Sequence, residues 1–186
     1  MIPPGTKRKG IKMKDKAFLR SLLEYNGWAN AELYKKVFDL PPEEVTKKRK
    51  TLLESIHLSL NHLLAVDRMW IAHMQKRPHG IAVLRANLYD DMDELWAARQ
   101  EQDRSMVDYL EALSAEELEE VVDYELLGGN KGSMSRAMCF AHIITHGSYH
   151  RGWIADMFGQ AEALPVTQDI PVYERAVRTL GLPALP

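Results

Sequence analysis

The sequence predicts an all-α protein, an antiparallel four-helix bundle with a long connection between its third and fourth helices. Four segments of more than 20 residues repeat apolar residues every three or four positions, which is the period of a helix with one buried face. No stretch between them predicts a sheet larger than a small hairpin, and 186 residues are enough for about one domain. Helices of this length bury their apolar faces well when they pack side by side.

The four helices are predicted at about residues 14–39, 52–74, 91–113 and 135–158. The first must end before the Pro41-Pro42 pair, because proline lacks the amide donor that continues a helix. The apolar stripe of the first helix contains Phe18, Leu22, Tyr25, Ala29 and Leu33. The stripes of the second and third contain Ile56, Leu60, Leu63, Trp70 and Met74, and then Met92, Leu95, Met106, Tyr109 and Leu113.

The segments that connect and follow these helices carry their own signals. Ser114, followed by glutamate three positions later, forms a capping-box pattern that predicts a short helix at 114–121. Residues 124–132 contain three glycines and an asparagine, which predicts a turn or small hairpin. Residues 163–171 predict a proline-bearing loop, and residues 172–180 a last short helix.

Charge and hydropathy exclude two classes of partner. The chain has 24 basic and 26 acidic residues, a net charge of −2, so no overall field attracts nucleic acid or anionic lipid. The basic run at 47–50 lacks aromatic neighbours and follows Glu43 and Glu44, so we interpret it as solvated. No apolar run approaches the length of a membrane span, and none follows the basic N-terminus as in a signal peptide.

The organisation predicted from this pattern is simple. Residues 1–12 are interpreted as a disordered tail or a leader added for expression, and residues 13–186 as a single domain. The single cysteine, Cys139, excludes an intramolecular disulfide and a zinc site built from cysteines. It lies on the apolar stripe of the fourth helix, which predicts a buried, inert thiol. We expect a reducing, cytoplasmic environment.

Histidines on the fourth helix carry the strongest chemical signal. His146 and His150 are four residues apart, so they lie one turn from each other on the same helix face. That face is the apolar stripe, which directs both imidazoles into the core. Two such rings can each give a nitrogen to one zinc-like ion. His142 lies a further turn away, too far to share the ion easily with His150, and is expected to have a supporting or structural role.

A third ligand must then come from another helix. The second helix offers His57, His62 and His73. His62 lies near the middle of that helix and flanks its apolar stripe, whereas His57 is about 140° round the helix and His73 about three turns further along. The alternative for every one of these histidines is a neutral core residue satisfied by a hydrogen bond.

Four further polar side chains are candidates for the site. Asp67 lies within the apolar stripe of the second helix and needs a partner, either Arg151 or the N–H of a ligand imidazole. A structural ion pair and a catalytic role are both open for Asp67 and Arg151. Tyr149 and Tyr25 are candidate pocket residues, with simple packing in the core as the favoured interpretation for each.

Three motifs taken in order resemble the DinB superfamily, the damage-inducible metalloproteins rather than the polymerase of that name. The motifs are Tyr25-Asn26-x-Trp28-Ala29-Asn30, Asn61-His62-Leu63-Leu64-x-x-Asp67-x-x-Trp70 and His146-x-x-x-His150-Arg151-Gly152. They span residues from about 14 to 160, covering all four predicted helices. One departure is Trp153, where many members of the superfamily have glutamine, and an indole there would make the neighbourhood drier.

The resemblance implies an up-down-down-up four-helix bundle that usually forms a homodimer. It also implies a divalent ion, often zinc or nickel, held by three histidines, which are His62, His146 and His150 in this sequence. Superfamily members include thiol transferases that use low-molecular-weight thiols, a thiol-dependent isomerase and proposed hydrolases. An ion with an open coordination position would lower the pKa of a bound thiol or water.

Three hypotheses follow for the function. The leading one is a metalloenzyme of the thiol transferase or hydrolase type, with a small-molecule substrate and a small thiol or water as nucleophile. The second is a non-catalytic metal- or ligand-binding bundle with a structural ion, which would need a fourth protein ligand such as Asp67. The third is a plain helical interaction module without metal.

Overall fold

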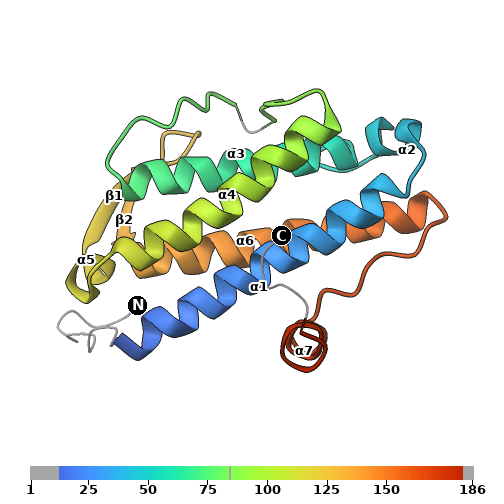
Figure 1. Cartoon of the computed structure of the whole chain (residues 1–186). Helices are drawn as coiled ribbons and strands as arrows, with labels where there is room; N and C mark the ends of the chain where they lie inside the picture. Colours follow the sequence, from blue (N-terminus) through green and yellow to red (C-terminus); the bar gives the residue numbers. More distant parts are fainter. Residues whose placement is uncertain (1–12, 84, 182–186) are drawn as a thin grey trace, which may run out of the picture.

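The computed structural model describes residues 13–83 and 85–181, and it is mainly helical with one small two-stranded sheet (Figure 1). The long helices are α1 (Met13–Phe38), α3 (Ile56–Met74), α4 (Met92–Ala112) and α6 (Arg136–Gln160). The shorter elements are α2 (Pro42–Thr46), α5 (Ala115–Glu119), β1 (Val121–Glu125), β2 (Lys131–Ser135), α7 (Ile170–Glu174) and a π-helical turn at Arg175–Thr179. The tail predicted at residues 1–12 lies outside the described residues.

The four long helices lie along one another, and α1 and α6 run opposite to α3 and α4 (Figure 1). α1 packs against α4 and α6, and α3 packs against the same two helices. α3 and α6, which carry the candidate ligands His62, His146 and His150, are one of these packed pairs. No helix in the described part of the chain is long and apolar enough to cross a membrane.

Capping side chains set the beginnings of the long helices. Ser55 accepts a hydrogen bond from the backbone N–H of Leu58, so α3 begins at Ile56 and not at the predicted residue 52. The Asp91 carboxylate caps α4, and the Ser135 hydroxyl caps α6. Because Ser55 caps α3, Leu52 lies outside that helix, half-exposed in the connection before it.

The core of the described residues consists of two large apolar clusters and a small third one, which includes Trp28 of α1 and Tyr173 of α7. One large cluster, nearer the small sheet, includes Leu23, Ile71, Met106 and Phe140. The other large cluster, nearer α2, includes Tyr34, Leu64, Leu95 and Phe158. Several buried polar residues lie at the middle of the long helices: Asn26, Asn30, His62, Asp67, Arg99, Asp103, His150 and Arg151. The buried ionisable and metal-ligating side chains therefore gather at the middle of the molecule.

Two sequence predictions need correction and one is confirmed. The all-α prediction lacked a sheet, but β1 and β2 pair in antiparallel register, with Val122 opposite Met134. The small hairpin predicted around residues 124–132 is thereby confirmed. Phe18, placed on the buried stripe of the first helix, is instead 63% exposed, because the core-facing side of α1 at this end is formed by Leu19 and Leu23.

Candidate metal centre

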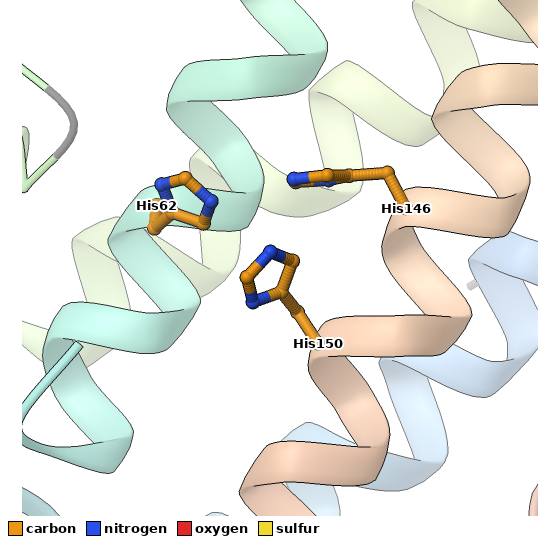
Figure 2. A group of neighbouring side chains, drawn as sticks. All are labelled: His62, His146 and His150. Carbon is orange, nitrogen blue, oxygen red and sulfur yellow. The ribbon is translucent and has the colours of Figure 1, made fainter. Parts of the chain in front are cut away.

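Three histidine side chains from α3 and α6 point toward one another (Figure 2). His62 comes from α3, and His146 and His150 come from successive turns of α6. One ligand nitrogen from each ring lies within 4.8 Å of those of the other two, and no other triad of His, Cys, Asp or Glu in the described residues does so. A tetrahedral ion with contacts of about 2.0–2.1 Å needs about 3.3 Å between its ligand atoms, so small ring rotations would suffice.

Local sequence explains why the rings converge. The spacing of four residues places the His146 and His150 rings on one face of α6, with centroids 4.4 Å apart. Across the helix interface, the centroid of the His62 ring lies 4.6 Å from that of His150 and 5.2 Å from that of His146. His62 and His150 are buried and His146 is partly buried. Of the three histidines of α3 considered as the third ligand, it is His62 that lies beside His146 and His150.

Burial keeps the His146 and His150 imidazoles in the form that binds metal. Desolvation, with a smaller contribution from the neighbouring imidazoles, lowers the pKa of His146 to about 3. Desolvation and His62 lower the pKa of His150 to about 4. Each of these two rings is therefore neutral at physiological pH, and each has a buried Nδ1 with no hydrogen-bond partner among the described residues. A lone pair on a neutral, desolvated imidazole is a good ligand for zinc-like ions.

The histidines line a pocket of about 720 Å³, a volume typical of small-molecule sites. Apolar and aromatic side chains surround them, among them Val66, Met69, Trp70, Leu127 and Trp153. An ion at the three histidines would therefore have protein on one side and the pocket on the other. This is the arrangement of a site with an open coordination position, as in catalytic rather than structural zinc centres.

A family model described as the DinB family matches residues 13–179, a range that contains all three histidines. The chain belongs to the DinB family. It is also similar to Protein DinB of Bacillus subtilis (strain 168), with 26% identity over 165 residues, which covers 87% of this chain and 95% of that protein. The resemblance stated from the three sequence motifs is thereby confirmed.

Aromatic neighbours of the histidines in this DinB family member differ in their exposure. Tyr149, expected to pack in the core, is instead 59% exposed and lines the pocket. Its ring centroid lies 5.0 Å from that of Trp153, which also lines the pocket. His142 packs on Trp70 at 4.6 Å between centroids and belongs to the pocket wall. Tyr25 does pack in the core, and its hydroxyl donates to the carbonyl of Gln168.

Asp67 has a different partner from those expected at the sequence level. Arg99 of α4 donates to its carboxylate at 2.6 Å, and Arg151 does not. Burial raises the pKa of Asp67 to about 6 against the opposing effect of Arg99. Because Asp67 belongs neither to the histidine triad nor to the pocket lining, it does not close the site as a fourth ligand.

The structure continues this ion pair into a buried network that sequence reasoning missed. Arg99 also donates to Asp103 at 2.8 Å, and the Asn30 amide donates to the same carboxylate. The Asn30 oxygen accepts from Arg151 at 3.0 Å, and Asn26 accepts from Arg151 at 2.7 Å. The sequence motifs contain Asn26, Asn30, Asp67 and Arg151, but nothing in them shows that these residues are joined through Arg99 and Asp103. The spacing of Arg99 and Asp103, four residues apart on one helix, is equally common in exposed pairs.

Proposed function

We propose that this DinB family member is a metal-dependent enzyme of the transferase or hydrolase type, with its divalent ion, zinc or nickel, held by His62, His146 and His150. Such an ion, when bound with an open position, would lower the pKa of a small thiol or a water. The observation that carries the proposal is that three imidazoles, those of His146 and His150 neutral at physiological pH, converge at the wall of a small-molecule pocket.

The residues of the chain supply the rest of the site. The buried apolar side chains of Val66, Met69 and Trp70 lie beside the histidines in the pocket wall, and such low-polarity surroundings strengthen electrostatic interactions. Tyr149 reaches the same pocket from α6 with a hydroxyl that can donate to a bound molecule. The proposed substrate is a small electrophile, and the proposed co-substrate is a small thiol or a water.

The contacts of Asp67 favour an enzyme over a structural metal site. A structural zinc site closes with four protein ligands, and Asp67 was the side chain expected to provide the fourth. Its carboxylate is held by Arg99, 1% exposed, on the neighbouring helix. A non-catalytic bundle with a structural ion is therefore the less favoured function.

The fold that we propose for this site is the four-helix bundle of the DinB family, with up-down-down-up topology. The opposite directions of α1 and α6 relative to α3 and α4 support it, as do the contacts between these four helices. A homodimer in the cytoplasm is the corresponding proposal for the assembly, and sedimentation velocity would test its oligomeric state.

Metal analysis of three variants tests the proposal. We expect close to one zinc or nickel ion per chain in the wild type and in His79→Ala, a histidine outside the triad. In His150→Ala the metal content should fall at least about tenfold with unchanged helix content by circular dichroism, because one of three ligands is lost. Equal metal content in His150→Ala, or no uptake of supplied zinc or nickel by the wild type, would contradict the proposed centre.

A spectroscopic experiment then separates the enzyme from the structural site. In the cobalt-substituted protein, a thiol that enters an open position should add a sulfur-to-metal charge-transfer band in the near ultraviolet. A closed structural site would leave the cobalt spectrum unchanged at every thiol concentration.

A further inference from the structure

We infer that Arg151 is a positioning residue of the proposed metal centre, and that Asn26 and Asn30 of α1 hold it in place. Arg151 is not one of the candidate ligands, but it fixes the turn of α6 that carries His146 and His150. The inference rests on the proposed function in one respect, since it takes the histidine triad as the metal centre. It assigns a role to the sequence motif on α1, none of whose described residues belongs to the triad or lines its pocket.

Each of the two ligands on α6 is followed directly by a residue that faces α1. Gly147 follows His146, and Arg151 follows His150, so these two residues form a second pair one turn apart. The second pair lies about 100° round the helix from the ligands. The ligand pair faces α3 (Figure 2), and the second pair faces α1. Both sets of contacts therefore act on one turn of α6, residues 146–151.

The side chain of Arg151 is buried among neutral hydrogen-bond acceptors. Its Nη1 donates to Asn26 at 2.7 Å and to Asn30 at 3.0 Å, and its Nη2 donates to Ser148 at 3.2 Å. The two asparagines lie one turn apart on α1, whereas Ser148 lies on α6 between the two ligands. The guanidinium thus ties the ligand-bearing turn to two successive turns of α1, and its planar fork cannot be reproduced by a single ammonium group.

Gly147 shows how closely α1 packs against this turn. A Cβ added there would lie 2.8 Å from the Asn26 amide oxygen and 2.9 Å from Nη1 of Arg151. These two atoms form the shortest of the three hydrogen bonds, and they rest on the backbone of α6 at the residue after His146. At Gly152, in the same helix, an added Cβ meets no atom within 4 Å. Loss of the contact at Gly147 would therefore loosen the backbone between the two ligands directly.

A second face of the α1 motif is anchored to the C-terminal segment. The Tyr25 hydroxyl donates to the carbonyl of Gln168 at 2.7 Å. Trp28 packs on Tyr173 of α7, with ring centroids 5.5 Å apart. α1 is therefore held from behind at the turns that bind the guanidinium, so it offers a fixed support to α6.

Metal affinity depends on such a support because an ion holds its ligand atoms at set distances, about 2.0–2.1 Å for zinc and imidazole. Ligands that are already in place lose less freedom when the ion binds, so they bind it more tightly. Changes to groups that orient metal ligands typically weaken binding about 10–100-fold. Arg151 acts through the helix backbone and makes no hydrogen bond to a ligand ring among the described residues, so we expect the lower end of this range.

Two buried arginines of α6 provide a matched test. Arg151→Lys keeps the positive charge but loses the fork, so a change in zinc affinity would not come from altered charge. Arg136→Lys is the control, because Arg136 lies in the first turn of the same helix and donates to the carbonyls of Met74 and Glu117. Asn26→Ala removes only the closest acceptor of Arg151 and decides the question if Arg151→Lys fails to fold.

Zinc affinity would be measured by competition with a chromophoric chelator, on variants whose helix content matches the wild type by circular dichroism. Arg151→Lys should weaken zinc binding about tenfold and Asn26→Ala at least about threefold, with Arg136→Lys within about twofold of the wild type. The visible spectrum of the cobalt-loaded protein should change in Arg151→Lys and not in Arg136→Lys. In chelated protein, the backbone amides of residues 147–151 should exchange faster with solvent in Arg151→Lys than in Arg136→Lys.

Two results would overturn the inference. One is a zinc affinity within about twofold of the wild type in both Arg151→Lys and Asn26→Ala. The other is an equal loss in Arg151→Lys and Arg136→Lys, which would reflect general stability and not the ligand-bearing turn.

Amide exchange separates this failure from failure of the metal proposal. Faster exchange at residues 147–151 in Arg151→Lys, without any zinc uptake by the wild type, would reject the metal centre and retain Arg151 as the support of this turn. Zinc uptake by the wild type that neither Arg151→Lys nor Asn26→Ala alters would reject the positioning role alone.

Discussion

Zinc binding at about pH 5.5 is expected to release few protons, because two of the three ligand histidines are already neutral. A histidine with an ordinary pKa near 6.5 is about 90% protonated at this pH, so three such ligands would release about 2.7 protons per ion. The pKa of His146 lies at about 3 and that of His150 at about 4, so neither holds a proton to lose. His62 alone then limits ligand proton release to about one.

Isothermal titration calorimetry in acetate and in MES at the same pH measures the number of protons released per zinc ion. The apparent binding enthalpies in the two buffers differ by that number multiplied by the difference between the ionisation enthalpies of the buffers. A zinc-bound water with a pKa near 7 adds less than about 0.1 proton at pH 5.5. Asp67, with a pKa of about 6, adds at most about 0.8 proton if the ion perturbs it, and Asp67→Asn removes that contribution. Release of about 2.5 protons or more in Asp67→Asn would refute the assignment of neutral, desolvated ligands.

The remaining predictions concern stability. Gly147→Ala should destabilise the fold by about 1–3 kcal/mol, because an added Cβ would lie 2.8 Å from the amide oxygen of Asn26. Gly152→Ala in the same helix meets no atom within 4 Å and is the control, with an unfolding midpoint in urea no lower than that of the wild type. Asp67→Asn should cost about 3 kcal/mol by the same assay, because it removes a carboxylate partner of the buried Arg99; an unchanged midpoint would mean that the pair contributes nothing. Zinc at about a thousand times its dissociation constant should stabilise the wild type by about 4 kcal/mol, and chelation should abolish this shift in thermal unfolding.

The long helices were predictable because each combines a long apolar stripe with a clear stop or cap. The pairing of His146 and His150 followed from helix geometry alone, since residues four apart in an α-helix lie on the same face. Helix geometry already favoured His62 over His57 and His73, because His62 lies near the middle of its helix beside the apolar stripe. The family resemblance then implied the same residue, whereas periodicity alone does not show which turn of one helix faces which turn of another. The boundary error at residue 52 arose because Leu52 continues the apolar period beyond the Ser55 cap.

Contacts between segments distant in the sequence were not predictable. Leu126 and Leu127 belong to a segment that local signals predict only as a turn or small hairpin, yet they form part of the pocket wall. The ion pair between Arg99 and Asp67 joins residues 32 apart in the chain. Such pairs depend on which helix faces pack together, and that information lies in the tertiary arrangement rather than in any local period.

The buried network explains how α6 holds its ligands in place. Consecutive residues on a helix point about 100° apart, so His150 and Arg151 leave α6 in different directions. The His150 ring faces His62 on α3, while the Arg151 guanidinium reaches Asn26 and Asn30 on α1. α6 is therefore held from two sides at the turn that carries the site, once by the proposed metal ligands and once by hydrogen bonds independent of any ion. Because the second set persists without metal, the histidines stay close to their binding arrangement, and metal uptake need not order the helix.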